Sequence, residues 1–499
     1  MHAVPDTLDI PALIRSLKDQ DPAQGVRLIE THISWVLITP STAYKIKKPV
    51  KFSFVDFRAL AQRKHFCEEE VRLNQRLAPE IYQGVVPILY CPTKGLWSID
   101  PVSPFDCAEI VDWAVKMHAF NASGTLDQAG EIQPRQIDAI ADAIASFHEH
   151  EKPIAAPTPF SSPAEIARIA NENLGDLKAQ WPNDPRIARL DDWNKQTLEK
   201  LKPFFEQRQV NGAVKDCHGD LHLGNIAWGN DKPIIFDCIE FSDTLRCIDV
   251  INEIAFLFMD LHAKGQATMA WRFLNRWLEH TGDYDGLKSL MFYASYRALV
   301  RAKISMHQNK PADVEKYLVL AEHFTHLQNP TLTLMHGFSG SGKTFESQRL
   351  LQSEGAIRLR SDVERKRLFG LKSTVRTQSA VHAGMYQELA TEQTFDRLYD
   401  ITERLLSAGF KVIVDATFLK RGLREKFIKL AKSREVPVRI RDMAVAPETC
   451  RERILSRQAQ QTDASDATLE VLEQQLRTAD PLSPEELALT MVSGTEPGA

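Results

Sequence analysis

Two kinds of hydrophobic spacing alternate along the N-terminal third of the chain. Residues 8–20 carry apolar side chains at helical spacing. From residue 32 the pattern becomes strand-like in ISWVLIT and AYKIKK, and the turn at residues 40–42 between them predicts a hairpin. Helical spacing returns in residues 55–82 and ends near Pro79. The segments GVVPILY, GLWSID and AEIVDWAVKM then predict further strands, so this part combines strands with helices.

The middle of the chain is predicted to be mostly helical. Residues 134–150 have a clear amphipathic pattern, and two charged helices are expected between Lys152 and Glu206. Further helices are predicted over 266–281, 284–307 and 311–328, with a break at Asn309-Lys310-Pro311. We expect the last of these to lie in a linker helix, residues 311–330.

At Thr331 the pattern changes to short apolar strands that alternate with helices. The strands are TLTLMH, AIRLR, GFKVIVD and VPVRIRDMAV. Such an alternation is typical of an α/β domain with a parallel sheet. We place this domain at residues 331–480, and the polar residues 481–499 are expected to form a mobile tail.

The stretch Cys217–Phe241 holds the chemistry of the first part. Asp220 follows a His-Gly pair, Asn225 comes five residues later, and Asp237 ends an apolar run. Phosphoryl transfer from ATP requires a carboxylate that accepts the proton of the attacking hydroxyl, and an amide and a second carboxylate that hold Mg²⁺. We therefore interpret Asp220 as the base and Asn225 and Asp237 as metal ligands. The competing interpretation is a polar turn between two strands.

This stretch resembles the HGDxHxxN loop and following Asp of the aminoglycoside phosphotransferase family, a branch of the protein-kinase-like fold. The resemblance implies an α+β, two-lobed protein-kinase-like domain over residues 1–310, with an N-lobe at about 25–117 and a C-lobe at about 118–310. Such a fold uses a lysine of the third strand to bind the α- and β-phosphates, and a helical glutamate to hold that lysine.

The resemblance selects Lys45 as the phosphate lysine, because Ala43-Tyr44-Lys45-Ile46 matches the strand pattern of the family. Lys47 lies two residues later on the same face and remains an alternative. The helix run from Glu70 to Leu77 resembles the Glu-Ala-x-x-Leu-x-x-Leu helix of the family, which favours Glu70 over Glu68 and Glu69 as the partner. A solvated lysine and an exposed acidic face are the competing interpretations.

A second nucleotide motif follows the strand at residue 331. The sequence GFSGSGKT has the full spacing of a P-loop, in which backbone N–H groups surround phosphates, the lysine reaches the β- and γ-phosphates and the threonine hydroxyl binds Mg²⁺. The residues expected to bind nucleotide are Gly337, Ser339, Gly340, Ser341, Gly342, Lys343 and Thr344, with Thr344 also a metal ligand.

This second half resembles the kinase group that includes polynucleotide kinase, gluconate kinase and zeta-type toxins. The resemblance implies that Asp362 and Arg365 activate the acceptor, and that Asp415 is a Walker-B-like metal ligand. Arg457, with Arg453 as the next choice, is expected to close over the transferring phosphate. A solvated basic helix face and a helix N-cap at Asp362 are the alternatives.

Composition narrows the setting in which these motifs act. The 499 residues include 43% hydrophobic and 25% charged, with a net charge of −5, so no nucleic-acid or membrane surface is evident. No apolar segment has the length of a membrane span or signal peptide. The seven scattered cysteines favour a reducing cytoplasm over a disulfide framework or a zinc site.

Together these patterns predict a cytoplasmic, bifunctional phosphotransferase with two ATP- and Mg²⁺-dependent sites. Each domain is expected to phosphorylate a hydroxyl group of a small molecule, whose identity and relation to aminoglycosides the sequence leaves open, as it does the oligomeric state. The alternatives are an ATP-binding sensor and, for the C-terminal half, a toxin-like or nucleic-acid 5′-end kinase. The absence of a basic stripe makes nucleic acid the less favoured acceptor.

Overall fold

The computed structural model describes residues 8–20, 25–52, 55–101, 106–119, 124–326, 329–371, 385–460 and 468–491. The chain forms two compact units. The first comprises residues 1–132, 146–169 and 198–257, and the second comprises 133–145, 170–197 and 258–499. Residues 258–310 thus group with the P-loop part, and the domain boundary near residue 310 stays a prediction.

The first unit contains a six-stranded antiparallel sheet in the order β1-β2-β3-β8-β6-β7. Its strands are β1 (Arg27–Glu30), β2 (Ser34–Ile38), β3 (Thr42–Lys47), β6 (Tyr82–Cys91), β7 (Leu96–Ile99) and β8 (Glu109–His118). The predicted hairpin is confirmed as β2 and β3, whose register pairs Val36 with Lys45.

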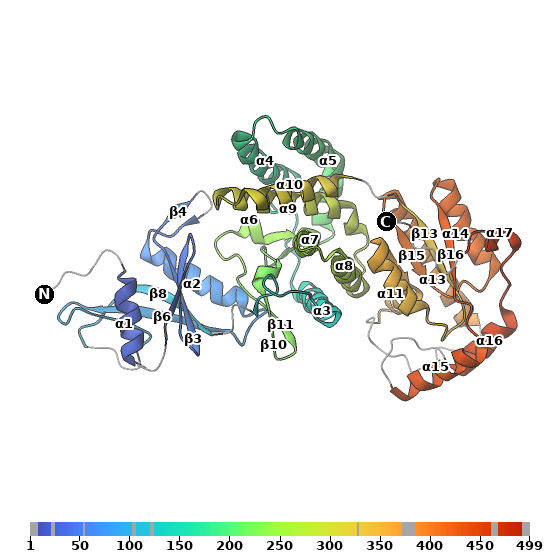
Figure 1. The fold of residues 1–499 in the computed structure, drawn as a ribbon, viewed down its shortest axis with the longest axis horizontal. Coiled ribbons are helices and arrows are strands. Elements are labelled where there is room, and N and C mark those ends of the chain that lie inside the picture. Colours follow the sequence, from blue (N-terminus) through green and yellow to red (C-terminus); the bar gives the residue numbers. More distant parts are fainter. Residues whose placement is uncertain are drawn as a thin grey trace. The chain divides into compact units, whose positions relative to one another are not determined.

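The two faces of this sheet are covered by different helices (Figure 1). Helix α1 (Ile10–Gln20) buries Leu13 and Leu17 against one face. Helix α2 (Leu60–Asn74) packs its Cys67 against the other face. Because strand side chains alternate between faces, Lys45 and Lys47 both point toward the α2 side, which is where the predicted glutamate lies.

Short elements complete the first unit. They are β4 (Lys51–Phe52), β5 (Val55–Asp56), β9 (Val214–Asp216), the 3₁₀ turn η2 (Leu223–Asn225), β10 (Ile226–Gly229), β11 (Lys232–Ile235), α6 (Asp243–Arg246) and β12 (Cys247–Asp249). The antiparallel pairs are β4 with β5, β9 with β12, and β10 with β11.

Helices make up most of the chain between the sheet and the P-loop, as the sequence predicts. They are α3 (Pro134–His150), α4 (Pro163–Gln180), α5 (Pro185–Val210), α7 (Val250–Ala263), α8 (Ala267–Thr281), η3 (Asp285–Ser289), α9 (Leu290–His307) and α10 (Pro311–Thr325). Helix α10, expected as a linker, packs on α9, where the Ser295 hydroxyl donates to Ala321 O at 3.0 Å.

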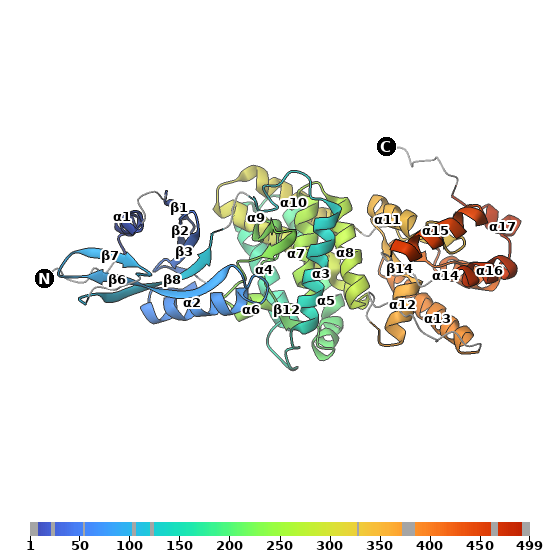
Figure 2. The same ribbon diagram turned by 90° about the horizontal axis from the view of Figure 1, so that it is seen from below.

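The second unit holds a four-stranded parallel sheet in the order β14-β15-β13-β16, which confirms the predicted α/β architecture. Its strands are β13 (Leu332–His336), β14 (Ile357–Arg360), β15 (Val412–Asp415) and β16 (Val438–Asp442). The surrounding helices are α11 (Lys343–Glu354), α12 (Ser361–Leu368), α13 (Met385–Ser407), α14 (Arg421–Ser433), α15 (Pro447–Gln460) and α16 (Leu469–Thr478) (Figure 2).

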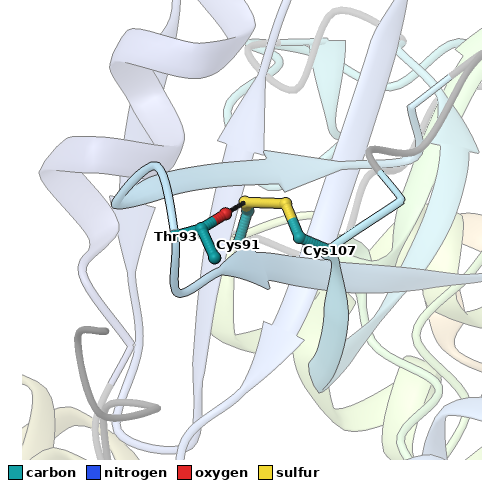
Figure 3. Close-up of a disulfide and its surroundings, with 3 residues drawn as sticks. All are labelled: Cys91, Thr93 and Cys107. Atoms are coloured by element: carbon teal, nitrogen blue, oxygen red, sulfur yellow. Dashed lines mark hydrogen bonds between the residues drawn. A yellow bond between two sulfur atoms is a disulfide. The ribbon is translucent and has the colours of Figure 1, made fainter.

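One disulfide joins Cys91 to Cys107, with the sulfurs 2.10 Å apart (Figure 3). The expectation of reduced cysteines is therefore wrong for this pair. Strands β6 and β8 are antiparallel neighbours, and Tyr90 pairs with Glu109, so the chain brings together two cysteines that are 16 residues apart. The five other cysteines are free and buried. Among the described helices, none has the length and apolar character needed to cross a membrane.

The mobile tail from residue 481 stays a prediction, although the described residues of this segment, 481–491, include a helix. Residues Pro484–Leu487 form helix α17, which begins with a capping box between Ser483 and Glu486. The Glu486 carboxylate accepts hydrogen bonds from the buried Arg424 at 2.7 and 3.0 Å. A buried guanidinium requires such a partner, and this requirement holds α17 on α14.

Replacing Glu486 by Gln is expected to destabilise the second unit by about 3–5 kcal/mol, because the buried Arg424 would lose its counter-charge. The midpoint of urea unfolding measures this effect. Glu485→Gln is the matched control, since Glu485 is exposed on the same helix. Equal midpoints for the two variants would show that the Arg424–Glu486 pair does not anchor the tail.

Candidate active sites

The His-Gly-Asp loop of the first unit is held by a buried carboxylate. Glu253 of α7 accepts the backbone N–H groups of His218 at 2.7 Å and Gly219 at 3.0 Å. Gly219 has φ +85°, and a Cβ at this position would lie 2.9 Å from Leu245 O, so only glycine fits the turn. These bonds fix the backbone from which Asp220 projects.

Asp220 and Asn225 are in direct contact, as their spacing predicts. The Asn225 amide nitrogen donates to the Asp220 carboxylate and to its backbone carbonyl, each at 3.0 Å. His222 Nε2 lies 3.4 Å from the same carboxylate, and its Nδ1 accepts the Gly224 N–H at 3.0 Å. These hydrogen bonds from the amide nitrogen orient the Asn225 side chain. Its side-chain oxygen has lone pairs with which it can bind a cation.

The β10–β11 hairpin brings Asp237 back to this loop. Ile226 pairs with Ile235, and the Phe236 N–H donates to Asn225 O at 3.0 Å, so Asn225 and Asp237 lie at the same end of the hairpin. Asp237 adopts φ +64°, which Asp tolerates better than most residues. Carboxylate and amide oxygens at one place are the ligands that suit Mg²⁺.

Both candidate lysines contact Glu70. Lys45 Nζ lies 2.8 Å from the Glu70 carboxylate and 2.5 Å from that of Asp237. Lys47 Nζ lies 2.7 Å from Glu70 and also pairs with Glu240. The Lys45 side chain is 15% exposed, whereas that of Lys47 is fully buried. Of the two, Lys45 is thus the one that contacts a predicted metal ligand.

Electrostatics in this cluster keep Glu70 ionised. Burial raises the pKa of Glu70, but the ammonium groups of Lys45 and Lys47 outweigh it and lower the pKa to about 2. Burial likewise lowers the pKa of Lys45, while Asp237 and Glu70 raise it well above its usual range. The cluster therefore holds Lys45 as a fixed cation beside Asp237.

Sequence reasoning missed two glutamates of this site. Glu253 was detectable as an acid in the first turn of the strongly apolar helix α7. Glu240 was detectable as a second acid three residues after Asp237 in an apolar stretch. Asp249 lies at the head of that helix, but it does not bond to the His-Gly-Asp loop in the way that Glu253 does. It pairs with Arg208 at 2.7 and 2.8 Å.

A second group of potential metal ligands lies beneath the loop. His148, Cys217 and Glu253 are buried, and their ligand atoms lie within 4.8 Å of one another. Both Glu253 oxygens already accept backbone N–H groups, and Cys217 Sγ donates to Ile248 O at 3.5 Å. We interpret this group as the core that supports the loop.

In the second unit the P-loop connects β13 to α11, as predicted. Gly340 has φ +82°, and a Cβ there would lie 2.6 Å from Cys450 O, so the turn requires glycine. Lys343 Nζ donates to Gly337 O at 2.9 Å and to Phe338 O at 2.8 Å, which places the ammonium group inside its own loop. Two carbonyl groups of the loop thus hold the Lys343 ammonium group beside its own backbone.

Asp415 ends β15 next to the P-loop helix. It is buried, and its carboxylate accepts the Ser347 hydroxyl at 2.9 Å. Asp362 opens α12 after β14, and its side chain reaches solvent. Partial desolvation by the surrounding protein raises the pKa of the Asp362 carboxyl, Arg360 opposes this effect, and Asp415 adds to it. Arg365 donates to Thr391 at 3.1 Å.

The arginines of α15 separate into different environments. Arg451 pairs with Glu473 of α16 at 2.7 Å. Arg453 Nη1 lies 3.3 Å from Ser341 O and 3.5 Å from Gly340 O, so it contacts the P-loop itself. The side chain of Arg457, the first choice for closing over phosphate, lies outside the described residues.

Two family models match different parts of the chain. Residues 58–290 match the model of the Phosphotransferase enzyme family, and residues 332–482 match the model of an AAA domain. A protein of Mycobacterium tuberculosis (strain ATCC 25618 / H37Rv), described as uncharacterized, is 28% identical over 450 residues, which is 87% of each chain. A protein of the same description from Mycobacterium bovis has the same identity and coverage.

Solved structures with detectable similarity include kinases of both kinds. A choline kinase from Cryptosporidium parvum is 12% identical (TM-score 0.39), with 70% of this chain and 97% of that chain covered. The GDP and kanamycin complex of an aminoglycoside phosphotransferase is also 12% identical (TM-score 0.37; 62% and 97% covered). A gluconokinase from Sinorhizobium meliloti 1021 is 18% identical (TM-score 0.23; 33% and 81% covered).

The predicted combination of a kinase-like phosphotransferase domain and a P-loop kinase-like domain is confirmed, as is the prediction of a kinase. The roles of the individual site residues stay predictions. The structure brings together Lys45, Glu70 and Asp237, and it joins Asp220 to Asn225.

Replacing Glu70 by Gln is expected to lower stability at pH 7, with a difference from the parent that narrows as the pH falls. The folded pKa of about 2 lies below the ordinary value of 4.5, so the ionised carboxylate stabilises the fold above pH 4.5 and loses this effect as the pH falls through 2. Urea unfolding across this range measures the difference.

Glu68→Gln serves as the control for this series, because Glu68 is exposed on the same helix. It is expected to change the free energy of unfolding by less than about 0.5 kcal/mol. A stability difference between parent and Glu70→Gln that is the same at every pH would contradict the buried ion-pair cluster.

Proposed function

We propose that each of the two domains transfers the γ-phosphoryl group of ATP to a hydroxyl acceptor. One of them matches the Phosphotransferase enzyme family, and the other is a P-loop domain. The observation that carries the proposal is the convergence of Asp220, Asn225 and Asp237 at the end of the β10–β11 hairpin, with Lys45 bonded to Asp237. This set contains a base, two oxygen ligands and a phosphate-binding cation.

In the first domain, Asp220 accepts the proton of the acceptor hydroxyl as its oxygen attacks the γ-phosphorus of ATP, and the bond from that phosphorus to the β–γ bridging oxygen breaks to release ADP. Asn225 holds this carboxylate in place by donating a hydrogen bond from its amide nitrogen at 3.0 Å. Glu253 holds the backbone of the same loop by accepting the His218 N–H. Lys45, kept cationic by Glu70, is placed to neutralise the α- and β-phosphates. A Mg²⁺ ion held by Asn225 and Asp237 would neutralise the charge on the transferring phosphates.

In the second domain, the backbone N–H groups of the P-loop and Lys343 bind the phosphates, and Thr344 and Asp415 would hold Mg²⁺. Asp362 lies at the carboxyl end of β14, beside the strand that ends at Asp415, which is where an acceptor hydroxyl would meet the γ-phosphate. Its raised pKa suits a group that accepts a proton. Arg453 supplies positive charge at the P-loop.

We assign small hydroxyl compounds as the acceptors of both domains. The net charge of −5 disfavours a polynucleotide acceptor, because binding its backbone requires a basic surface. The proposed dependence on ATP is consistent with a cytoplasmic setting. The Cys91–Cys107 disulfide lies in the β6–β8 region and includes none of the predicted site residues.

Asp220→Asn is expected to reduce phosphoryl transfer by the first domain by about 10²–10⁴-fold, because the amide cannot accept the hydroxyl proton. The assay measures transfer from γ-labelled ATP to pools of hydroxyl metabolites, aminoglycosides and oligonucleotides. ATP binding should persist. Glu206→Gln, at an exposed position, is the control. Undiminished transfer by Asp220→Asn would remove Asp220 as the base.

Lys343→Ala is expected to abolish labelling by the second domain while leaving acceptors of the first domain labelled. The physical reason is that the loop loses the cation that reaches the β- and γ-phosphates. Lys432→Ala, at an exposed position of α14, is the control. Loss of labelling of every acceptor in Lys343→Ala would show that the chain has a single functional site.

A further inference from the structure

The parallel sheet of the second unit has an edge that is completed by a helix from outside the AAA-domain match. Strand β14 is an edge strand, and α8 lies beside the P-loop helix α11 in both views (Figures 1 and 2). The buried Asn275 of α8 donates to Ala356 O at 2.9 Å and accepts the Arg358 N–H at 2.7 Å. Its carboxamide thus bonds the strand as a neighbouring peptide group would.

Four residues later on the same helix, Glu279 forms a buried ion pair. Its carboxylate accepts hydrogen bonds from Arg358 at 2.6 and 3.2 Å and lies 3.4 Å from Arg360. The Glu279 residue is 4% exposed and Arg358 is 5% exposed. Burial raises the pKa of Glu279, but Arg358 and Arg360 outweigh it and lower the pKa to about 2.

Arg358 connects this pair to the predicted metal ligands. Its Nη1 lies 3.3 Å from Thr344 O and 3.3 Å from the Ser347 hydroxyl. Ser347 in turn donates to the Asp415 carboxylate at 2.9 Å. One guanidinium therefore links Glu279 to the P-loop threonine and, through one hydroxyl, to Asp415.

Helix α12, which carries the predicted acceptor-activating residue Asp362, contacts the C-terminal end of α8 and the residues after it. This helix follows β14 directly. Arg367 of α12 donates to Glu279 O at 2.8 Å, at the C-terminal end of α8. The buried Tyr284 donates to Glu364 of α12 at 3.2 Å. Residues 275–284 thus contact both the strand and the helix that frame Asp362.

We propose that Glu279 is a positioning residue of the C-terminal phosphate site, acting through Arg358 on Thr344 and Asp415. It follows that the segment 258–290, which lies in the phosphotransferase-family match, also completes the P-loop domain. This inference rests on the proposed nucleotide-binding role of the second domain. A purely structural ion pair would stabilise the fold without affecting the metal ligands.

The physical basis is the location of the Arg358 charge. With Glu279 ionised, the guanidinium is neutralised by that carboxylate and contacts the start of α11 through the Thr344 carbonyl and the Ser347 hydroxyl. Without that carboxylate, a buried cation lacks its counter-charge, and the acid that its hydrogen-bond network reaches through Ser347 is Asp415. A cation drawn toward Asp415 competes with Mg²⁺ for the same oxygens.

The test is Glu279→Gln in the full chain, measured as binding of a fluorescent ATP analogue during a Mg²⁺ titration. Binding by Lys343→Ala, which reports the first domain, is subtracted. We expect the Mg²⁺ concentration at half-saturation to rise by about ten-fold or more, equivalent to about 1.4 kcal/mol. Asp285→Asn is the matched control, because it removes an exposed pair with Arg404 in the same region.

Each outcome separates the two proposals. If the parent chain shows no Lys343-dependent binding, the proposed function of the second domain fails. If the parent binds and Glu279→Gln has the same Mg²⁺ requirement, the positioning role is overturned, even where the melting temperature falls. Should Glu279→Gln not fold, Glu279→Asp keeps the charge but moves it by one methylene; an unchanged Mg²⁺ requirement in that variant overturns the role as well.

Discussion

The organisation of the first domain depends on a carboxylate that is buried between two ammonium groups. Glu70 could not remain ionised in the interior without Lys45 and Lys47, and neither lysine could be buried without it. Glu240 provides the remaining counter-charge on the Lys47 side, and Asp237 does so on the Lys45 side. This requirement fixes β3, α2 and the segment after β11 against one another, and it holds Lys45 at the position where we propose that it binds phosphate.

The second domain reaches a similar result by different means. Its phosphate loop relies on backbone N–H groups and on glycine turns, so few side chains of the loop need fixed positions. The side chains that do matter are secured by carboxylates behind them, as Glu279 secures Arg358. In the first domain, Glu253 secures the His-Gly-Asp loop by accepting two of its backbone N–H groups. In both sites a buried acid bonds to the element that presents the chemistry.

The close association of α8 with β14 bears on how the two family-matched regions share one chain. Residues 258–310 group with the P-loop part, although the phosphotransferase-family match extends to residue 290. Edge strands of isolated sheets expose unpaired backbone groups and invite unwanted pairing. Here the Asn275 carboxamide bonds two backbone groups at this edge, Ala356 O and the Arg358 N–H, and cutting the chain at residue 331 would remove this partner.

The sequence by itself determined the local elements, the two motifs and the class of chemistry, because spacing along one segment controls loop shape and strand or helix period. Asp220 with Asn225, and the glycines before Lys343, are of this kind. Tertiary structure alone decided which distant groups meet: Lys45 rather than Lys47 on Asp237, Glu253 under the loop, Cys91 on Cys107, and Glu279 behind Arg358. These partners are separated by 16 to 192 residues, and no local period encodes the pairing.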